Sequence, residues 1–231
     1  MIRRIRIGII DSGVHAAHPH VGNIAGGVTI ANAAPDPTPY VDHLGHGTAI
    51  AALIYSRAPQ AELFAVKIFH RALATNLADV LGAIDWCLLN NMDLINLSLG
   101  TTNQDHRSAF EQAVRKITAA GTGMVSAFEM AGTEALPGSL SGVVAVAAEP
   151  SKPPGQHDAQ IIRGKAVITA CPYPREIPGV PRDKNLHGVS FAVAHVTATL
   201  ANLWNPTAAV TEWEHLLLHR IQPAQFQSMS S

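Results

Sequence analysis

Short apolar runs recur along the chain, separated by polar or glycine-containing segments. Continuous runs of this kind are typical of strands buried on both faces, as in a parallel sheet. They predict strands at Ile5–Ile10, Leu63–Phe69, Leu94–Leu99, Met124–Phe128, Val143–Ala148 and Ala166–Ala170.

Between these runs, apolar residues recur at three- and four-residue spacing, which is typical of helices with one buried face. Asn76 is placed to cap one helix and Gly121 to end another. Thr211 and Glu214 can form a capping box at the start of the last helix. The predicted helices cover Leu77–Leu88, Phe110–Ile117, a segment from near His46 to Ile54, one from near Ser190 to Trp204, and one from Glu212 to about Ile221.

The alternation of strands and helices predicts a three-layer α/β fold, in which a doubly wound, mostly parallel sheet carries helices on both faces. A chain of 231 residues fits a single domain over 1–231. We expect the proline-rich segments 149–158 and 171–185 to be surface loops, and residues 222–231 to be a flexible tail.

Composition narrows the function classes. Hydrophobic residues make up 47% of the chain and charged residues 14%, which indicates a well-buried globular core. A net charge of −1 gives no basic surface for nucleic acid or anionic membranes, and no apolar stretch approaches a membrane span. Cys87 and Cys171 are too few for a disulfide framework, so we expect reduced thiols and a cytoplasmic location. The sequence indicates no cofactor and does not define the oligomeric state.

Three polar residues stand in apolar or glycine-flanked settings where their chemistry would be useful. Asp11 ends the first apolar run, His46 opens a helix of small residues, and Ser190 opens another. Taken singly, they could be a turn residue, a helix-start residue and a helix cap. Together they could form a nucleophile, its general base and the carboxylate that orients the base. Burying a carboxylate is costly unless a partner meets it, and His46 would be that partner.

The segments that hold these residues resemble the motifs of the subtilisin-like serine proteases, the subtilases. "IGIIDSGVHAAHP" resembles the family's Asp motif, "GHGTAIA" its His motif and "HGVSFAVAHV" its Ser motif, in the family's chain order. The resemblance implies a serine endopeptidase with Asp11, His46 and Ser190 as the catalytic triad. It also implies that Ser98, Leu99 and Gly100 bind the substrate peptide as an extended strand.

One family feature is missing. Subtilases place an Asn after the next strand, and its amide donates to the oxyanion formed during catalysis, whereas this chain reads "MVSAFEMAG". The position falls on Glu129 or, with a one-residue shift, on Met130. A neutral Glu129 could donate to the oxyanion and a charged one would repel it. Alternatively, Glu129 could line the primary specificity pocket and favour a basic residue.

The chain starts at the expected first core strand, so we expect a short form without the family's signal peptide and prodomain. That expectation favours an intracellular protease that processes a peptide or protein precursor. The alternative is a weakened pseudoprotease that binds extended peptides, because the oxyanion Asn is missing. A lipase-like hydrolase is disfavoured because no Gly-x-Ser-x-Gly motif surrounds Ser190.

Twelve histidines leave a metal site open as an alternative, above all at His15, His18 and His20. We favour solvated loop histidines there, since no carboxylate or thiol set completes a site, and we predict no metal. His195 is expected to pack inside its helix, and His187 could contact substrate.

Overall fold

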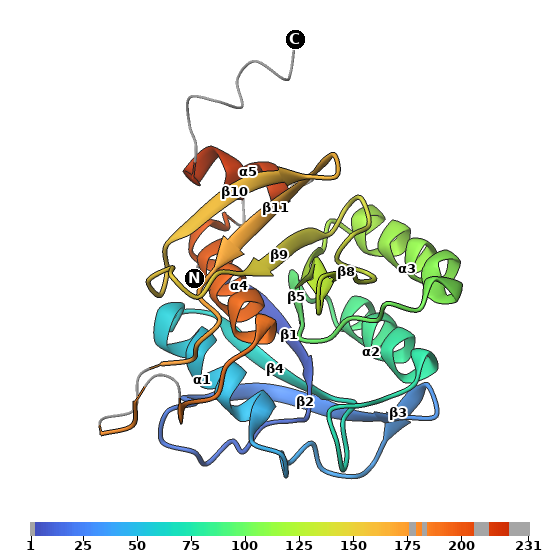
Figure 1. Cartoon of the computed structure of the whole chain (residues 1–231). Coiled ribbons are helices and arrows are strands. Elements are labelled where there is room, and N and C mark those ends of the chain that lie inside the picture. Colours follow the sequence, from blue (N-terminus) through green and yellow to red (C-terminus); the bar gives the residue numbers. More distant parts are fainter. Residues whose placement is uncertain (1–2, 176–178, 182–183, 206–212, 222–231) are drawn as a thin grey trace.

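The fold is built on one large sheet that crosses the molecule (Figure 1). The computed structural model describes residues 3–175, 179–181, 184–205 and 213–221. The strands of the large sheet are β1 (Arg6–Asp11), β2 (Ile24–Ala31), β3 (Ala34–Asp36), β4 (Glu62–Lys67), β5 (Leu94–Leu97), β6 (Gly123–Ala127), β9 (Val144–Ala148), β10 (His157–Ile162) and β11 (Lys165–Ala170). A separate hairpin pairs β7 (Glu129–Met130) with β8 (Thr133–Glu134).

The strand order is β10-β11-β9-β6-β5-β1-β4-β2-β3, and all neighbours are parallel except the two edge pairs, β10 with β11 and β2 with β3. This arrangement confirms the predicted α/β class with its mostly parallel sheet. Each of the six predicted strands is present, with bounds within two residues of the prediction. The central strand β1 therefore delivers Asp11 to the carboxyl edge of the sheet, where sites form in such folds.

Helices cover both faces of the sheet (Figure 1). The helices are α1 (His46–Arg57), α2 (Leu77–Leu89), α3 (Arg107–Ala119), α4 (Val189–Leu203) and α5 (Trp213–Ile221), with a short 3-10 turn at Gln104–His106. Residues of α1, α4 and α5 share one apolar cluster, and residues of α2 and α3 share another on the opposite face. As predicted, the Asn76 side chain caps α2 by accepting the Asp79 N–H at 2.9 Å.

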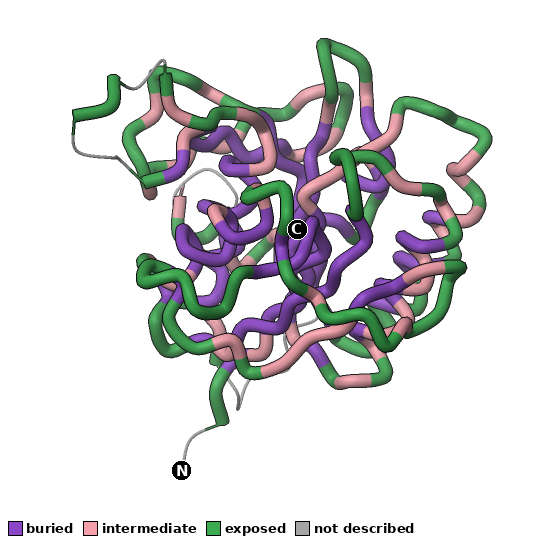
Figure 2. The backbone as a smooth tube through the Cα atoms, turned by 90° about the horizontal axis from the view of Figure 1, so that it is seen from below, coloured by how far each residue is buried: buried purple, intermediate pink, exposed green. Residues whose placement is uncertain are grey.

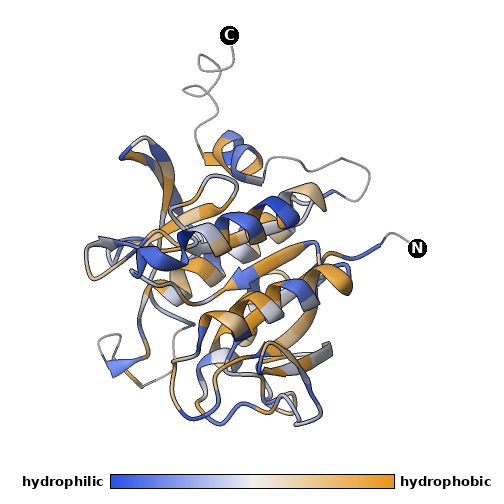
Figure 3. Cartoon of the chain, turned by 90° about the vertical axis from the view of Figure 1, so that its right-hand side faces the viewer, coloured by the Kyte–Doolittle hydropathy of each residue, from blue (hydrophilic) through white to orange (hydrophobic). Residues whose placement is uncertain are grey.

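The two apolar clusters explain why the central strands read as continuous apolar runs. Ile9 packs into the cluster of α1 and α4, while its neighbour Ile10 packs into the cluster of α2 and α3. Figure 2 shows the buried residues concentrated toward the centre of the molecule, and Figure 3 shows strands of mainly hydrophobic residues in its interior. Both faces of β1 are thus buried, as its composition predicts.

One predicted loop is wrong at its end, and some other predictions concern residues that the structure does not describe. The predicted loop 149–158 is wrong at its end, because β10 starts at His157 and pairs with β11 as an edge strand. Such an edge strand alternates exposed and half-buried residues, so it lacks the continuous apolar run that we used as a signal. In segment 171–185 the described residues hold no strand or α-helix. Thr211 and the tail 222–231 lie outside the described residues, and the single-domain assignment stays a prediction.

Candidate active site

Three elements converge to bring the predicted polar residues together. Asp11 is the last residue of β1 and fully buried, His46 is the first residue of α1, and Ser190 is the second residue of α4. Gly47 lets α1 approach the end of β1, because a Cβ on this residue would lie 2.2 Å from the Gly13 carbonyl oxygen and 3.1 Å from Asp11 Oδ1. The close approach sets His46 beside the buried carboxylate.

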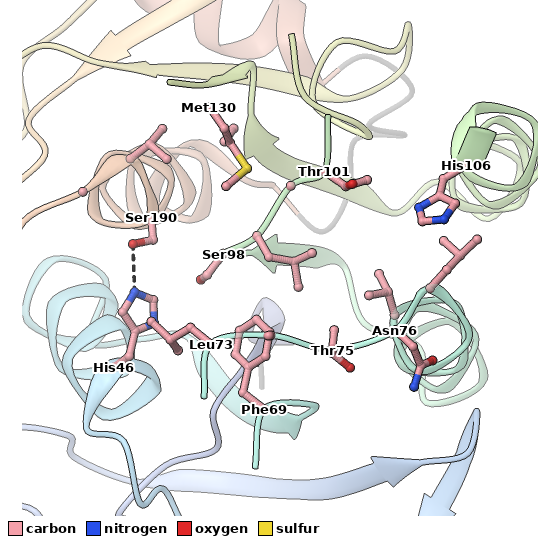
Figure 4. Close-up of a pocket in the computed structure, with 18 of the residues that line it drawn as sticks. His46, Phe69, Leu73, Thr75, Asn76, Ser98, Thr101, His106, Met130 and Ser190 are labelled. Carbon is pink, nitrogen blue, oxygen red and sulfur yellow. Dashed lines mark hydrogen bonds between the residues drawn. The ribbon is translucent and has the colours of Figure 1, made fainter. Parts of the chain in front are cut away.

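The three side chains form a continuous chain of hydrogen bonds. His46 Nδ1 lies 2.8 Å from Asp11 Oδ1, and His46 Nε2 lies 2.9 Å from Ser190 Oγ (Figure 4). An ionised carboxylate only accepts hydrogen bonds, so Nδ1 carries the proton and donates it. Nε2 of the neutral ring then accepts the hydrogen bond that the Ser190 hydroxyl donates. This tautomer suits a ring that takes a proton from a serine.

Charge around His46 favours its protonated form. Burial by itself lowers the pKa of His46, but the hydrogen bond that His46 donates to Asp11 and the negative charges of Asp11 and Asp42 outweigh it and raise the pKa above its ordinary value. The His46 side chain is only 14% exposed, so these charges act with little screening by water. The site can therefore hold the imidazolium that forms when His46 accepts a proton.

Asp42 is a second buried carboxylate near His46, and our sequence analysis missed it. Burial alone would raise its pKa, yet hydrogen bonds from the Thr48 side chain and backbone and from the Leu44 N–H hold the pKa below its usual value. Asp42 lies four residues before His46 and accepts a hydrogen bond from the Gly45 N–H, which fixes the loop that leads into α1. Its closeness to His46 in the sequence was the one signal that could have indicated this role.

Lys67 is the positive group of this network, and it too was missed. It ends β4 in register with Asp11, is 3% exposed, and donates from Nζ to the Ser12 carbonyl oxygen at 2.7 Å. Burial lowers the pKa of Lys67, and the charges of Asp42 and Asp11 act in the opposite direction. A lysine inside the apolar run Leu63–Phe69 carries the same signal as Asp11, because a buried charge needs partners.

A cleft of about 400 Å³ opens beside His46 and Ser190 (Figure 4). Ser98, Leu99 and Gly100 follow β5 and all line this cleft, as the substrate-binding prediction requires. Ser98 Oγ accepts a hydrogen bond from Asn96 Nδ2 at 2.7 Å, and Asn96 Oδ1 accepts one from Thr197 Oγ1 at 2.9 Å. Because Thr197 lies on α4, these bonds tie the wall of the cleft to the helix that carries Ser190.

The oxyanion candidate Glu129 lies outside this cleft. Among the described residues that line it is Met130, and Glu129 is not one of them. Glu129 stands opposite Glu134 in the β7–β8 hairpin and is partly exposed. The structure thus favours the one-residue shift that places Met130 at the cleft, and it gives no support to a Glu129 that selects basic residues there.

His195, His187 and the two cysteines take no part in the hydrogen bonds of the triad. His195 is 2% exposed within α4, and its Nε2 donates to the Tyr173 carbonyl oxygen at 3.0 Å, so it packs as expected. His187 is exposed and its ring lies 6.0 Å from that of Tyr173. Cys87 and Cys171 are buried, and neither forms a disulfide.

The described residues contain neither a metal-binding cluster nor a membrane-spanning helix. Within residues 3–175, 179–181, 184–205 and 213–221, no group of three or more His, Cys, Asp or Glu side chains could hold a metal ion. In the same part of the chain, no helix is long and apolar enough to cross a membrane.

A carboxylate, imidazole and hydroxyl in hydrogen-bonded sequence on an α/β sheet are the arrangement of a serine hydrolase. The description "Subtilase family" belongs to a family model that matches residues 3–160, a range that includes Asp11 and His46. This chain belongs to the subtilase family.

Named relatives agree with this assignment. The chain is 33% identical over 209 residues to the thermostable alkaline protease of Halalkalibacterium halodurans, a match that covers 85% of this chain and 55% of that protein. It is 34% identical over 156 residues to subtilisin E of Bacillus subtilis, covering 64% of this chain and 39% of subtilisin E. The chain thus spans about half the length, or less, of these curated relatives.

A solved structure shares the fold. The prenylagaramide maturation protease PagA superposes with a TM-score of 0.65 at 22% identity, over 86% of this chain and 74% of PagA.

Proposed function

We propose that this protein is a serine endopeptidase that hydrolyses peptide bonds through Asp11, His46 and Ser190. The observation that carries the proposal is the unbroken hydrogen-bond chain from the buried Asp11 through His46 to Ser190 Oγ, at the edge of a cleft. In the proposed reaction, His46 Nε2 takes the Ser190 proton as Oγ attacks the peptide carbonyl. His46 then gives that proton to the leaving amine, and water hydrolyses the acyl-enzyme.

Stabilisation of the oxyanion would come from the start of α4. The N–H of Ser190 is among the first four of the helix, which have no partner one turn earlier, and the helix dipole favours negative charge there. With Met130 at the position of the family's Asn, the amide donor to the oxyanion is missing, so we expect slower turnover than in a subtilase that keeps it.

The substrate in this proposal is a peptide or protein precursor. Its backbone would pair as an extended strand with the segment Ser98–Gly100. The name of PagA records a maturation protease, and the shared fold suggests the same kind of role here. Two buried cysteines without a disulfide are compatible with a reducing cytoplasm, which stays a prediction.

A fluorophosphonate probe tests the proposal directly. It reacts only with a serine whose proton is taken by a neighbouring base, so it should label the purified protein at Ser190, as mapped by mass spectrometry of the digested product. The intact His46–Ser190 contact favours turnover over the alternative of a peptide-binding pseudoprotease. Absence of labelling at any serine would leave only that alternative.

The pH dependence of kcat/KM should follow the titration of His46. The ring acts as a base only when neutral, and its pKa lies above the ordinary value of about 6.5. Activity should therefore rise as the pH climbs through that raised pKa, with a midpoint above 6.5. Rates measured between pH 5 and 9 on one peptide check this, and a midpoint below 6.5 would contradict the assigned charges of Asp11 and Asp42.

Glu129→Gln should leave the rate within about twofold and the pH profile unchanged. The reason is its position in the β7–β8 hairpin, outside the residues that line the cleft. The measurement is kcat against pH for both proteins. Loss of an alkaline limb together with a faster rate would instead place the Glu129 carboxyl at the oxyanion.

A further inference from the structure

The end of the cleft next to Ser190 has two facing walls. Ser98, Leu99 and Gly100 form one wall, and Met130 lies across from it (Figure 4). Ala127 also lines the cleft. If a peptide pairs with the first wall and presents its carbonyl to Ser190, the side chain of the residue that carries this carbonyl points between the walls. The width of this gap then decides which side chain can precede the cleaved bond. This step rests on the proposed function.

The gap is already narrow at Gly100. A Cβ built on Gly100 would lie 3.0 Å from the Ala135 Cβ, 3.3 Å from the Leu136 carbonyl oxygen and 3.4 Å from the Met130 sulfur. These contacts are at or inside van der Waals distance, so the space beside Gly100 is filled. Ala135 is fully buried, which leaves Met130, 41% exposed, as the group that borders the open part of the gap.

The backbone holds both walls in place. Thr101 and Leu136 exchange two hydrogen bonds, N to O at 2.9 and 2.8 Å, directly after Gly100. Across the gap, Met130 pairs with Thr133 in the β7–β8 hairpin. The two residues that close this hairpin, Ala131 and Gly132, have φ angles of 49° and 78°, as in the tight two-residue turns that match the strand twist. A hairpin of this length leaves the backbone of Met130 little freedom to withdraw.

The far end of the cleft differs from this end. It is bordered by the polar side chains of Thr75, Asn76 and His106 (Figure 4), and among the described residues that line the cleft none is Asp, Glu, Lys or Arg. The end beside Met130 thus offers a charged substrate side chain no carboxylate, ammonium or guanidinium partner.

We propose that Met130 is a specificity-determining residue, which restricts the side chain before the cleaved bond to Gly, Ala or Ser. The methionine occupies the volume that a Leu or Phe side chain of the substrate would need. Pushing it aside would cost contacts with the Gly100 wall, a cost that a methyl or hydroxymethyl group avoids.

Peptides that differ only in the residue before the cleaved bond test the proposal. The wild-type protein should hydrolyse the Ala peptide at least 30-fold faster, in kcat/KM, than the Phe or Lys peptide. Met130→Ala should raise the Phe-to-Ala ratio by about 10- to 100-fold, the range that added methylene groups give in a pocket. Met130→Leu, which keeps the volume, should keep the wild-type ratio. Leu89→Ala, at a residue 81% exposed on α2, is the matched surface control and should change nothing.

A wild-type preference for Phe or Leu, or an unchanged ratio in Met130→Ala, would overturn the role of Met130. Peptidyl phosphonates with Ala or Phe at the same position give the same comparison as rates of Ser190 labelling, so slow turnover does not prevent the test. A failure of the proposed function has a different signature. In that case neither peptides nor phosphonates react, and a small fluorophosphonate, which needs no pocket, also leaves Ser190 unlabelled.

Discussion

Replacing Ser190 by alanine is expected to lower kcat by about 10⁶-fold and to leave the fold intact. The Ser190 hydroxyl is the group that His46 Nε2 contacts at 2.9 Å, and alanine offers no oxygen to attack a peptide carbonyl. Ser190 is only partly buried and alanine suits a helix, so the free energy of unfolding should change by about 1 kcal/mol or less.

Steady-state hydrolysis of one peptide, with thermal unfolding of each protein, checks this result. Ser56→Ala is the matched control, because the Ser56 hydroxyl also donates one hydrogen bond, to the Leu53 carbonyl oxygen at 2.8 Å. Ser56 lies near the C-terminal end of α1, whereas His46 begins that helix. It should keep wild-type activity. A Ser190→Ala protein that retains even 1% of the rate would mean that another group is the nucleophile.

The central strands of the sheet can be identified from the sequence because their residues are buried on both faces. A strand such as β1 must be apolar at every position, and that signal does not depend on its partners. The strands at the edges, β2, β3 and β10, bury less of their surface. Glycines interrupt β2, and β10 alternates, so their identity depends on pairing with a neighbour that the sequence does not display.

The candidate triad was predictable for a related reason. Asp11, His46 and Ser190 each break an apolar or small-residue pattern at the end of a strand or the start of a helix, and the fold class places such ends together. Asp42 and Lys67 were missed because their role depends on contacts to Thr48 and Ser12 that cross from one element to another.

The choice between Glu129 and Met130 was beyond the sequence. Successive residues of a strand point to opposite faces, so a shift of one residue exchanges which side chain meets the cleft. The apolar pattern of "VSAFEMAG" fits either register. Only the pairing of Glu129 with Glu134 and of Met130 with Thr133 fixes the register of the hairpin.

Replacing Asp11 by asparagine is expected to lower kcat by about 10⁴-fold, the second largest effect. Asp11 Oδ1 now receives both the Ser12 N–H at 2.7 Å and His46 Nδ1 at 2.8 Å. An asparagine that turns its amide nitrogen toward His46 would donate to Nδ1, which forces the ring proton onto Nε2. Nε2 could then no longer accept the Ser190 proton.

The opposite orientation of the asparagine does not restore function. Its amide nitrogen would then occupy the place of Oδ2, which is buried without a hydrogen-bond partner among the described residues. An unpaired N–H there would lower the free energy of unfolding by about 1–3 kcal/mol. In either orientation the Asp11 charge, which together with that of Asp42 raises the pKa of His46, is gone, so the imidazolium formed during attack loses its hydrogen-bonded carboxylate.

Two measurements separate these effects in the Asp11→Asn protein. Its kcat should fall while KM stays within a few-fold, because Asp11 lies behind His46 and not on the cleft wall. The acidic limb of the remaining kcat/KM profile should move to lower pH, since His46 titrates without the Asp11 charge. Asp85→Asn, which removes a surface carboxylate bonded to Lys116, is the matched control and should keep wild-type kinetics. An Asp11→Asn protein within tenfold of wild-type kcat would show that the tautomer of His46 is set by something other than Asp11.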